Sequence, residues 1–470
     1  MSSAGTLQQL TLHGDIDESH LSGNPDISFF KQVYPHHTRF SMEGTTLQFI
    51  NSPQLRQNEG TSCTVTIERF ADLLMGTYFV FKLPAIYSDE ERQFRWIERI
   101  GHYIIRKATF MCDSEILEET TGEVLDILSE LNDGESEREA LAKMIGHVES
   151  LYAPRRKDPV LEVKDGIGYW TSYPKGEVGK PSIPETKIIV PLNWFFQRRT
   201  SDALPISSMI YTRLSIKLDL RPLRELYRLY DKTKNEYVSP NEYDTRGFGY
   251  WPITKFINQP GGEDFADTTP INIEGYLEAQ YALLTRSEGL LIANNPNLEY
   301  LVDSPQVLTA DAKTVNNFVL NLYGPCKEMI WFFRRSDVER YNTWNDFTAD
   351  EDHILKDAQI LFDDVPRTDV KPNEFWSTLQ PYMHHGRVPR KGLYLYSFSI
   401  DPAGPPSGSA NLSEISSVKM RMNLNPTAIP GTDVNSDGTP ISYYQLTFIN
   451  LHWNIFTITS GLGRLKYARI

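Results

Sequence analysis

The sequence of 470 residues is long enough for two large all-β domains or about three average ones. Its formal net charge of −14 would be repelled by phosphate backbones, so binding of nucleic acid along the whole chain is disfavoured. Ordinary glycine and proline contents and an aromatic fraction of 12% exclude collagen-like and disordered classes, which leaves a folded globular protein.

The cysteines and the amino terminus indicate the compartment. Cys63, Cys112 and Cys326 are far apart and form no Cys-x-x-Cys pair, so neither a disulfide framework nor a cysteine zinc site is expected, and a reducing compartment fits best. The first ten residues lack a basic stretch followed by an apolar one, and no apolar run approaches the roughly 18 residues of a membrane span. We therefore expect a soluble, unsecreted chain.

Short strand-like segments dominate the chain. Each is an alternating or continuous run of β-branched, aliphatic and aromatic residues, and clusters of Pro, Gly, Asn and Asp separate them. Such spacing is typical of sandwiches and jelly rolls rather than of alternating β and α units. The predicted strands cover residues 64–67, 78–84, 101–105, 187–196, 213–220, 317–323, 329–333, 393–400, 418–424 and 443–458.

Two helices are expected among these strands. The first begins at Ser136, where Ser-Glu-Arg-Glu forms a capping box, and apolar residues recur at helical spacing as far as Leu151. It would lie in a long insertion between strands. The second begins at Pro222, has apolar residues on one face and precedes the charged run at 231–236. Because it lies near the midpoint of the chain, residues 222–240 are predicted to be a linker.

The two halves of the chain share a weak pattern. A strand at 188–196 precedes an alternating strand at 213–218, and strands at 392–400 and 419–424 follow the same order. The later strands begin at residues 213 and 419, a spacing of 206 residues that suits one large sandwich. Alternation is common in all-β proteins, so the pattern leaves both duplication and coincidence open.

Two histidine pairs are candidate metal ligands. His36-His37 and His384-His385 share the pattern Tyr-x-His-His-x-Arg, and four imidazoles would suit zinc or copper. Adjacent residues of a strand point to opposite faces, however, so each pair offers only one ligand to a given side. We therefore interpret them as turn or strand-edge histidines engaged in hydrogen bonds.

Other sequence motifs typical of metal-binding or catalytic sites are absent or lie outside the structural setting that such sites require. The iron-oxygenase pattern His-x-Asp/Glu occurs at residues 13–15, before any convincing strand, and at 147–149, on a predicted helix. A calcium-loop pattern begins at Asp433, but its twelfth position is Tyr444 instead of Glu. Phosphate-loop and nucleophile-elbow motifs are absent from the sequence. The sequence provides no catalytic, cofactor-binding or metal-ligating residue, and no enzyme is predicted.

Several segments that this chemistry does not explain resemble a known family. Residues 24–34, Asn-Pro-Asp-Ile-Ser-Phe-Phe-Lys-Gln-Val-Tyr, are similar to the amino-terminal signature of the major capsid proteins of nucleocytoplasmic large DNA viruses. Further matches follow in the family's order, within about residues 20–465. They include Ile-Val-Pro-Leu-Asn-Trp-Phe at 189–195, Ala-Leu-Pro at 203–205, Lys-Glu-Met-Ile-Trp at 327–331, Gln-Pro-Tyr at 380–382, Gly-Leu-Tyr-Leu-Tyr-Ser-Phe at 392–398, Pro-Ser-Gly at 406–408 and Ser-Gly at 460–461.

The sequence departs from the family at two turns. Family members often carry Gln before Pro-Ser-Gly, where this chain has Pro405. They also carry an Asn-Gly turn ahead of an Arg, where this chain has Asp363-Asp364 ahead of Arg367. Both changes lie in loops, so they bear on the lineage and not on the family.

The resemblance implies an all-β fold of two consecutive eight-stranded jelly rolls with loop insertions and a few short helices. Residues 1–24 would form an N-terminal segment, 25–221 the first jelly roll, 222–240 the linker and 241–470 the second jelly roll. It also implies a structural major capsid protein whose homotrimers, as pseudo-hexagonal capsomers, tile the icosahedral shell of a large DNA virus. The resemblance implies no catalytic residue and no cofactor.

Partners and location follow from the same resemblance. The expected partners are further copies of the chain, within the trimer and in neighbouring capsomers, together with minor capsid, penton and inner-membrane proteins. The expected location is the virion capsid, assembled in the host cytoplasm. The net charge of −14 favours an inner face that makes no direct contact with nucleic acid. The competing interpretation is a jelly-roll carbohydrate-binding protein with exposed Trp or Tyr as stacking platforms.

Overall fold

A computed structural model describes residues 4–12, 22, 36–89, 91–157, 171–258, 265–312, 315–349, 352–425 and 444–467. The chain divides into two compact units, residues 1–41 and 42–470. In the first unit, the helix α1 (Ala4–Thr11) has no buried residue. None of the helices in the described ranges is long and apolar enough to cross a membrane.

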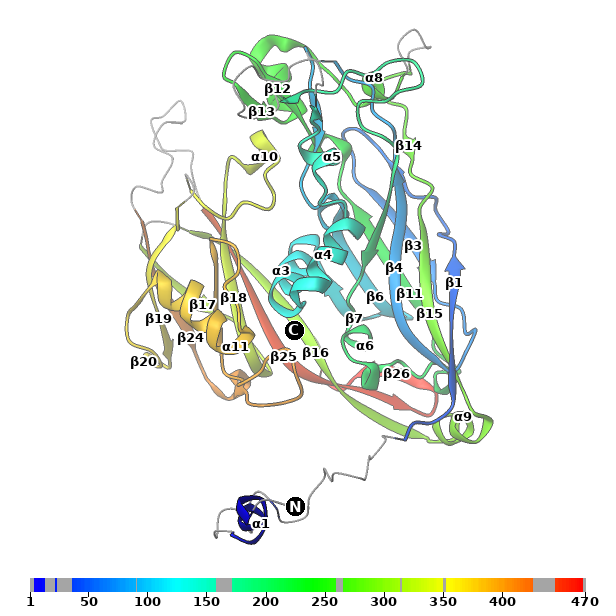
Figure 1. Ribbon diagram of the computed structural model, residues 1–470, viewed down its shortest axis with the longest axis vertical. Helices are drawn as coiled ribbons and strands as arrows, with labels where there is room; N and C mark the ends of the chain where they lie inside the picture. Colours follow the sequence, from blue (N-terminus) through cyan, green and yellow to red (C-terminus); the bar gives the residue numbers. More distant parts are fainter. Residues whose placement is uncertain are drawn as a thin grey trace. The chain divides into compact units, whose positions relative to one another are not determined.

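The first β-sandwich consists of two antiparallel sheets (Figure 1). One sheet has the strand order β1-β15-β4-β10, and the other has the order β3-β11-β6-β7. The strands are β1 (Phe40–Leu47), β3 (Thr61–Thr66), β4 (Leu73–Leu83), β6 (Ile105–Cys112), β7 (Glu115–Thr120), β10 (Thr186–Pro191), β11 (Leu214–Leu220) and β15 (Tyr276–Leu284).

The second β-sandwich is built in the same way. Its sheets have the orders β16-β25-β18-β22 and β17-β24-β19-β20, and short strands extend both. The main strands are β16 (Asn297–Ala312), β17 (Val315–Leu320), β18 (Pro325–Arg335), β19 (Leu355–Phe362), β20 (Val365–Pro366), β22 (Leu393–Ser397), β24 (Val418–Leu424) and β25 (Tyr444–Thr459). The short additions are β21 (Lys371–Pro372), β23 (Ala410–Asn411) and β26 (Leu462–Leu465).

Both sandwiches have the same topology. Taken in chain order, the first, eighth, third and sixth of the eight main strands form one sheet, and the second, seventh, fourth and fifth form the other. This confirms the prediction of two eight-stranded jelly rolls. The strands matched in the sequence, β10 with β22 and β11 with β24, occupy equivalent positions. The weak sequence pattern therefore corresponds to a repeat of the fold.

The alternating strands are half-buried, as their sequences indicate. In β11, every second residue from Leu214 to Leu220 is buried, and the residues between them are partly exposed. In β24, every second residue from Val418 to Leu424 is buried in the same manner. Because successive side chains of a strand point to opposite faces, each of these strands covers the core with one face only.

The remaining elements lie in the connections between main strands. The short strands are β2 (Gln54–Leu55), β5 (Phe94–Trp96), β8 (Arg156–Lys157), β9 (Thr171–Ser172), β12 (Tyr227–Asp231), β13 (Glu236–Val238) and β14 (Ile271–Asn272). The helices are α2 (Ile100–Tyr103), α3 (Gly122–Asn132), α4 (Glu135–Met144), α5 (Glu149–Tyr152), α6 (Phe195–Arg198), α7 (Pro240–Tyr243), α8 (Thr254–Ile257), α9 (Arg286–Ala293), α10 (Val338–Tyr341) and α11 (Gln380–His385). Single 3-10 or π turns are η3 (Thr200–Asp202), η4 (Ile206–Ser208), η5 (Leu223–Glu225), η6 (Asp244–Phe248), η7 (Phe375–Leu379) and η8 (Leu412–Glu414).

Several of the predicted elements differ from the structure. The strand predicted at residues 101–105 is wrong, because residues up to 103 form α2. The backbone N–H of Gly101 donates to the carbonyl of Ile145 at 2.8 Å, and the turn packs there as a helix. The helix predicted from Ser136 begins one residue earlier and ends at Met144, and α5 forms the rest after Gly146, whose φ of 78° ends a helix.

The helix predicted from Pro222 is also wrong. Only the single turn η5 forms there, and β12 and β13 follow as a hairpin whose strands pair with each other. The charged run at 231–236 supplies the hairpin turn, in which the Asp231 carboxylate accepts from the N–H of Thr233 at 2.8 Å. Beyond it, β15 returns to pair with β4, so strand pairing of the first jelly roll continues to Leu284. Within the segment predicted as a linker, β12 thus pairs with both β13 and β5.

Each sandwich encloses an apolar core. In the second, the buried Trp331 ring lies 5.4 Å from the ring of Trp376 and 6.1 Å from that of Phe448. The core of the first sandwich also includes residues from strands of the second, Val302, Phe456, Ile458 and Leu465. The two cores are therefore in contact through the ends of β16, β25 and β26.

The three cysteines are buried in these cores and carry no disulfide. Burial raises the pKa of the Cys63 and Cys112 thiols to about 12. The thiols remain protonated at neutral pH, where only the thiolate would be reactive. They therefore pack in the cores as small, unreactive side chains.

The junction between the two jelly rolls as the candidate functional site

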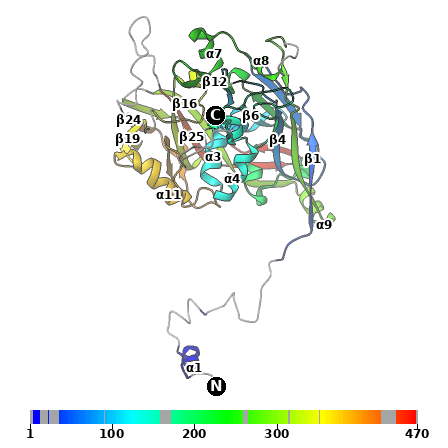
Figure 2. The same ribbon diagram turned by 45° about the horizontal axis from the view of Figure 1, so that its top comes forward.

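The helix α3 lies between the two sandwiches, as the two views in Figures 1 and 2 agree. It belongs to the insertion between β7 and β10 of the first jelly roll, and Thr121 caps its first turn. Its apolar residues pack on the outer face of the second sandwich, in a cluster of Val124, Ile127, Leu128, Leu131, Ile330, Phe332, Phe347, Leu393, Leu395, Ile449 and Leu451. The helix thus joins the first jelly roll to a sheet of the second.

The carboxylate of Asp126 in α3 is fully buried and accepts from both jelly rolls. From the first, Arg99 Nη1 lies 2.6 Å from Oδ1, and the Tyr103 hydroxyl donates to Oδ2 at 3.0 Å. From the second, the Arg390 guanidinium pairs with Oδ2. Burial alone would raise the pKa of this carboxyl, but Arg390, the hydrogen bond from His102 and Arg99 hold it well below its ordinary value. Asp126 is therefore ionised at neutral pH.

Two further carboxylates of α3 extend this ionic contact. Glu130 accepts from the backbone N–H of Arg390 at 2.7 Å, and its backbone carbonyl accepts from Arg387 Nη1 at 2.7 Å. In the first turn, Glu123 pairs with Arg221 of the first jelly roll at 2.7 Å and with Arg334 of the second at 2.6 Å. A carboxylate in the first turn of a helix is also stabilised by the helix dipole.

A second ionic cluster lies beside α6. The carboxylate of Asp303 on β16 pairs with Lys327 Nζ at 2.5 Å and with Arg199 Nη2 at 3.2 Å. The neighbouring Arg198 pairs through Nη2 with Glu118 of β7 at 2.5 Å and donates through Nη1 to the carbonyl of Asp303 at 3.3 Å. Arginines of the first jelly roll thus hold the strand β16 of the second.

Replacing Lys327 by Met is expected to lower the free energy of unfolding by about 2 kcal/mol, the usual value for a buried hydrogen bond to a charged group. The Asp303 carboxylate would lose its closest cation and keep Arg199, while Met fills most of the volume of the Lys stem. Urea unfolding at equilibrium would measure the change. Lys419→Met is the matched control, because Lys419 pairs with the exposed Asp364. Equal losses in the two variants would contradict the assignment.

Apolar and backbone contacts complete the junction at the ends of β25 and β26. The ring of Phe195 lies 5.6 Å from that of Phe456, and the Cys112 thiol donates to the carbonyl of Gly463 at 2.9 Å. The backbone N–H of Gly463 donates to the Thr212 hydroxyl at 3.2 Å. The end of the chain thus packs on the first jelly roll.

A loop of the second jelly roll reaches the insertion of the first. Asn342 donates through Nδ2 to the carbonyls of Arg224 and Tyr227 at 2.7 and 2.8 Å. Trp344 Nε1 donates to the carbonyl of Glu225 at 2.8 Å. These buried amide and indole groups fix the loop to η5 and β12, and so connect the jelly rolls at a fourth place.

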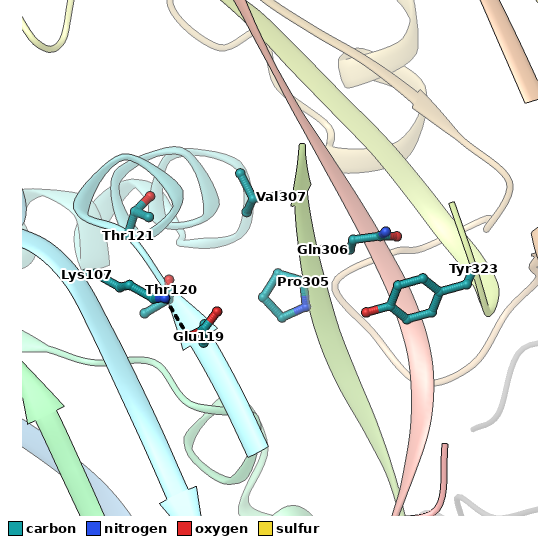
Figure 3. A pocket seen from close by; sticks show the side chains of 8 residues that line it. All are labelled: Lys107, Glu119, Thr120, Thr121, Pro305, Gln306, Val307 and Tyr323. Carbon is teal, nitrogen blue, oxygen red and sulfur yellow. Dashed lines mark ion pairs between the residues drawn. The ribbon is translucent and has the colours of Figure 1, made fainter. Parts of the chain in front are cut away.

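A cleft of about 210 Å³ lies between β7 and β16 in this junction (Figure 3). Lys107 and Glu119, which pair at 2.6 Å, line one side, and Pro305 with Gln306 lines the other. The only carboxylate of its lining, Glu119, is thus neutralised by a neighbouring cation. The cleft offers no cluster of acid, base and nucleophile.

The two histidine pairs proposed as candidate metal ligands belong to different compact units of the chain. His384 and His385 lie on the helix α11 instead of a strand; a ring nitrogen of His384 is 3.2 Å from the carbonyl of Ile400, and His385 Nε2 is 2.7 Å from Glu328 Oε1. His36 and His37 are exposed in the first unit. Among the described residues, no group of three or more His, Cys, Asp or Glu could hold a metal ion.

His147, from the iron-oxygenase pattern at residues 147–149, has a local role. His147 lies in the turn between α4 and α5, not on a helix, and stacks on the ring of Tyr152 at 5.0 Å. The patterns at residues 13–15 and 433–438 lie outside the described residues.

The sequence reasoning missed α3 and its carboxylates. The signal was present: Thr121 precedes the helix as a capping residue, and apolar residues recur at helical spacing from Val124 to Leu131. The helix is short, follows a predicted strand closely, and its acidic residues would be taken for a solvated face. Their arginine partners in the second jelly roll, Arg334 and Arg390, lie far away in the sequence, so this pairing itself left no local pattern.

Two family models match the chain. The model of the major capsid protein N-terminus matches residues 28–246, and the model of the large eukaryotic DNA virus major capsid protein matches residues 295–464. Together they span both jelly rolls and well over half of the chain. The chain belongs to the major capsid proteins of large eukaryotic DNA viruses.

Relatives of this capsid protein align along its whole length. Probable capsid protein 4 of Acanthamoeba polyphaga mimivirus is 23% identical, over 99% of each chain. The major capsid protein of Phaeocystis pouchetii virus is 22% identical, over 99% of this chain and 100% of its own. The solved structure of PBCV-1 VP54 has a TM-score of 0.68 at 19% identity, over 94% of this chain and 100% of that chain, which shows the shared fold. The predicted family is confirmed, and the chain is a structural protein of the virion capsid.

Proposed function

We propose that this major capsid protein forms homotrimers that serve as pseudo-hexagonal capsomers of an icosahedral shell. The observation that carries the proposal is the repeat of one topology in two sandwiches that the junction fixes to each other. Two such sandwiches in each of three subunits give six similar faces around a threefold axis. The outer strands of their sheets, such as β10 and β22, would meet neighbouring sandwiches, which protects sheet edges from uncontrolled pairing.

The native mass of the purified chain tests the trimer. A mass of about 162 kDa, three times 53.9 kDa, is expected from light scattering, with particles of hexagonal outline in electron micrographs. A stable monomer of 53.9 kDa that binds a glycan specifically would contradict the proposal.

The contacts in the junction support a mechanical role without catalysis or cofactor. Its buried carboxylates are neutralised by arginine or lysine, and the cleft in Figure 3 contains no free acid or base from its own lining. The carbohydrate-binding alternative would need exposed aromatic platforms. Among the described residues, every tryptophan is buried or half-buried. The described tryptophans thus serve the cores, whereas Tyr211, Tyr382 and Tyr467 are exposed.

The expected partners are neighbouring capsomers, minor capsid and penton proteins, and proteins of an inner membrane, with assembly in the host cytoplasm. The net charge of −14 supports an inner face that makes no direct contact with the genome or with anionic lipid. An electrostatic map of the assembled shell tests this, because acidic residues concentrated on the outer face would contradict it.

The strand pairing supports a proposed division of the chain. The first jelly roll would run from β1 to β15, with residues 222–240 as part of its last insertion, and the second would begin at β16. The boundary then lies between Leu284 and Asn297, where α9 forms the connection. Residues 1–24 would remain an N-terminal segment.

A further inference from the structure

A second cavity, of about 370 Å³, opens between the two jelly rolls. The first jelly roll contributes β5, the residues after it and β12, and the second contributes the segments at 342–348 and 390–391. Basic residues outnumber acidic ones in its lining, which includes Arg95, Arg228, Arg390 and Lys391 against Glu98 and Asp346.

Two of these arginines lie on paired strands. Arg95 of β5 is directly opposite Arg228 of β12 in the antiparallel register. Residues in this relation project from the same face with Cβ atoms about 5 Å apart, and like charges placed so destabilise a sheet. The pairing therefore brings two guanidinium groups to one wall of the cavity.

Neither guanidinium forms an ion pair with a carboxylate of the described residues. Arg228 donates through Nη2 to the carbonyl of Tyr237 at 2.8 Å, and its Nε is buried without a hydrogen-bond partner. Arg95 lies over the Tyr237 ring, 3.5 Å from its centre. Burial, and then the charge of Arg95, lowers the pKa of Arg228 to about 9. The charged form of this pair is thus poorly compensated by the protein.

Other charged groups of the lining already have ion-pair or hydrogen-bond partners within the protein. Arg390 pairs with Asp126 and Glu130 of α3. The carboxylate of Glu98 accepts from Asn345 Nδ2 at 2.8 Å. Glu98 still acts on Arg95 and Arg228 through its charge, so the charge of these two arginines is only partly compensated in the cavity.

We propose that this cavity binds a phosphate-bearing anion between Arg95 and Arg228. The planar guanidinium group presents parallel N–H donors that match two oxygens of one phosphate. The volume of about 370 Å³ exceeds that of a single phosphate, since one water occupies only about 30 Å³, so a short chain of phosphate groups would fit. Because both jelly rolls line the cavity, the bound anion would stabilise the junction.

Calorimetric titration of the full chain in a buffer free of phosphate and sulfate tests this site. Tripolyphosphate should bind with one site per chain, and inorganic phosphate more weakly. ATP tests the source of the ligand: tighter binding than tripolyphosphate would indicate a nucleotide, and equal or weaker binding an inorganic anion.

Arg228→Gln and Arg95→Gln should each weaken tripolyphosphate binding at least tenfold. Arg106→Gln, at an exposed position of β6, is the control and should leave binding within twofold.

Chemical footprinting of the wild-type chain tests the same site without requiring any variant to fold. Modification of arginines by phenylglyoxal, quantified by mass spectrometry, should fall at least threefold at Arg95 and Arg228 when tripolyphosphate is present, and stay unchanged at Arg106. Absence of saturable binding by the wild-type chain would overturn the proposal. Binding that persists unchanged in both folded arginine variants, or equal protection of Arg106, would overturn it too.

Discussion

Asp126→Asn is expected to lower the free energy of unfolding by about 3–5 kcal/mol, the cost of removing one partner from a buried ionic network. Asn keeps the shape of the side chain but removes the charge that compensates Arg99 and Arg390. Because Arg390 belongs to the second jelly roll and α3 to the first, the loss would loosen the junction as well as the local packing. Equilibrium unfolding in urea, followed by tryptophan fluorescence, would measure it.

The pH dependence of this difference identifies its cause. The folded-state pKa of Asp126 lies well below the ordinary value, so its contribution is fully present above the unfolded-state pKa of about 4 and is lost as the pH falls through the folded-state pKa. The difference between wild type and Asp126→Asn should therefore be constant from pH 7 to about pH 5 and decrease in more acidic solution.

Asp369→Asn is the matched control for Asp126→Asn. The side chain of Asp369 is 90% exposed and its distance to Lys371 is 3.8 Å, so water compensates its charge. A loss of about 0.5 kcal/mol or less is expected. If Asp126→Asn were no more destabilising than this control, or if its effect were the same at every pH, the buried ionic network would not be what holds α3.

The strands β11 and β24 were predictable because one face of each is buried. Alternation of apolar and polar residues in β11 and β24 follows directly from the period of two in a strand, and the structure buries every second residue of both. The helix predicted at Pro222 failed for a related reason. Leu223, Leu226, Tyr227 and Tyr230 fit a helical stripe over about two turns, but Tyr227 begins a strand that pairs with β5. Tertiary pairing decided between two patterns that the short segment fits equally well.

The turn at Asp363-Asp364 shows how a departure from the family can keep its structure. Both residues have positive φ, 48° and 66°, as the primed two-residue turn between β19 and β20 requires. Asn-Gly adopts this conformation most easily, and Asp tolerates it better than most residues. Here, the Asp363 carboxylate also accepts from the N–H of Ser417 at 2.8 Å, and Asp364 pairs with Lys419 at 2.7 Å. Local hydrogen bonds thus compensate for the missing glycine.

The junction could not be predicted from local patterns. Asp126 and Arg390 are 264 residues apart, and each looks like an ordinary surface charge in its own segment. Only the packing of α3 on the second sandwich removes both from water and makes their pairing a condition of stability. The resemblance to the capsid family implied two jelly rolls but carried no information on the residues that fix them to each other.

Gly122→Ala tests the position of α3 without changing any charge. A Cβ at Gly122 would lie 2.1 Å from the carbonyl oxygen of His102 and 2.7 Å from that of Ile105, distances that no packed carbon adopts. Both atoms belong to the backbone of neighbouring elements, so the start of α3 would have to shift. A loss of about 3 kcal/mol is expected from this overpacking, with fewer trimers by native mass measurement.

Gly134→Ala, at the start of α4 in the same insertion, is the control for Gly122→Ala. A Cβ there would have Glu137 Oε2 as its nearest neighbour, at 3.4 Å, which is ordinary contact with a flexible side chain. Its φ of −62° suits alanine, so a change of less than about 1 kcal/mol is expected. If Gly122→Ala were no more destabilising than Gly134→Ala and formed as many trimers as that control, α3 could move without consequence. The junction would then have to rest on the Asp303 cluster and the ends of β25 and β26.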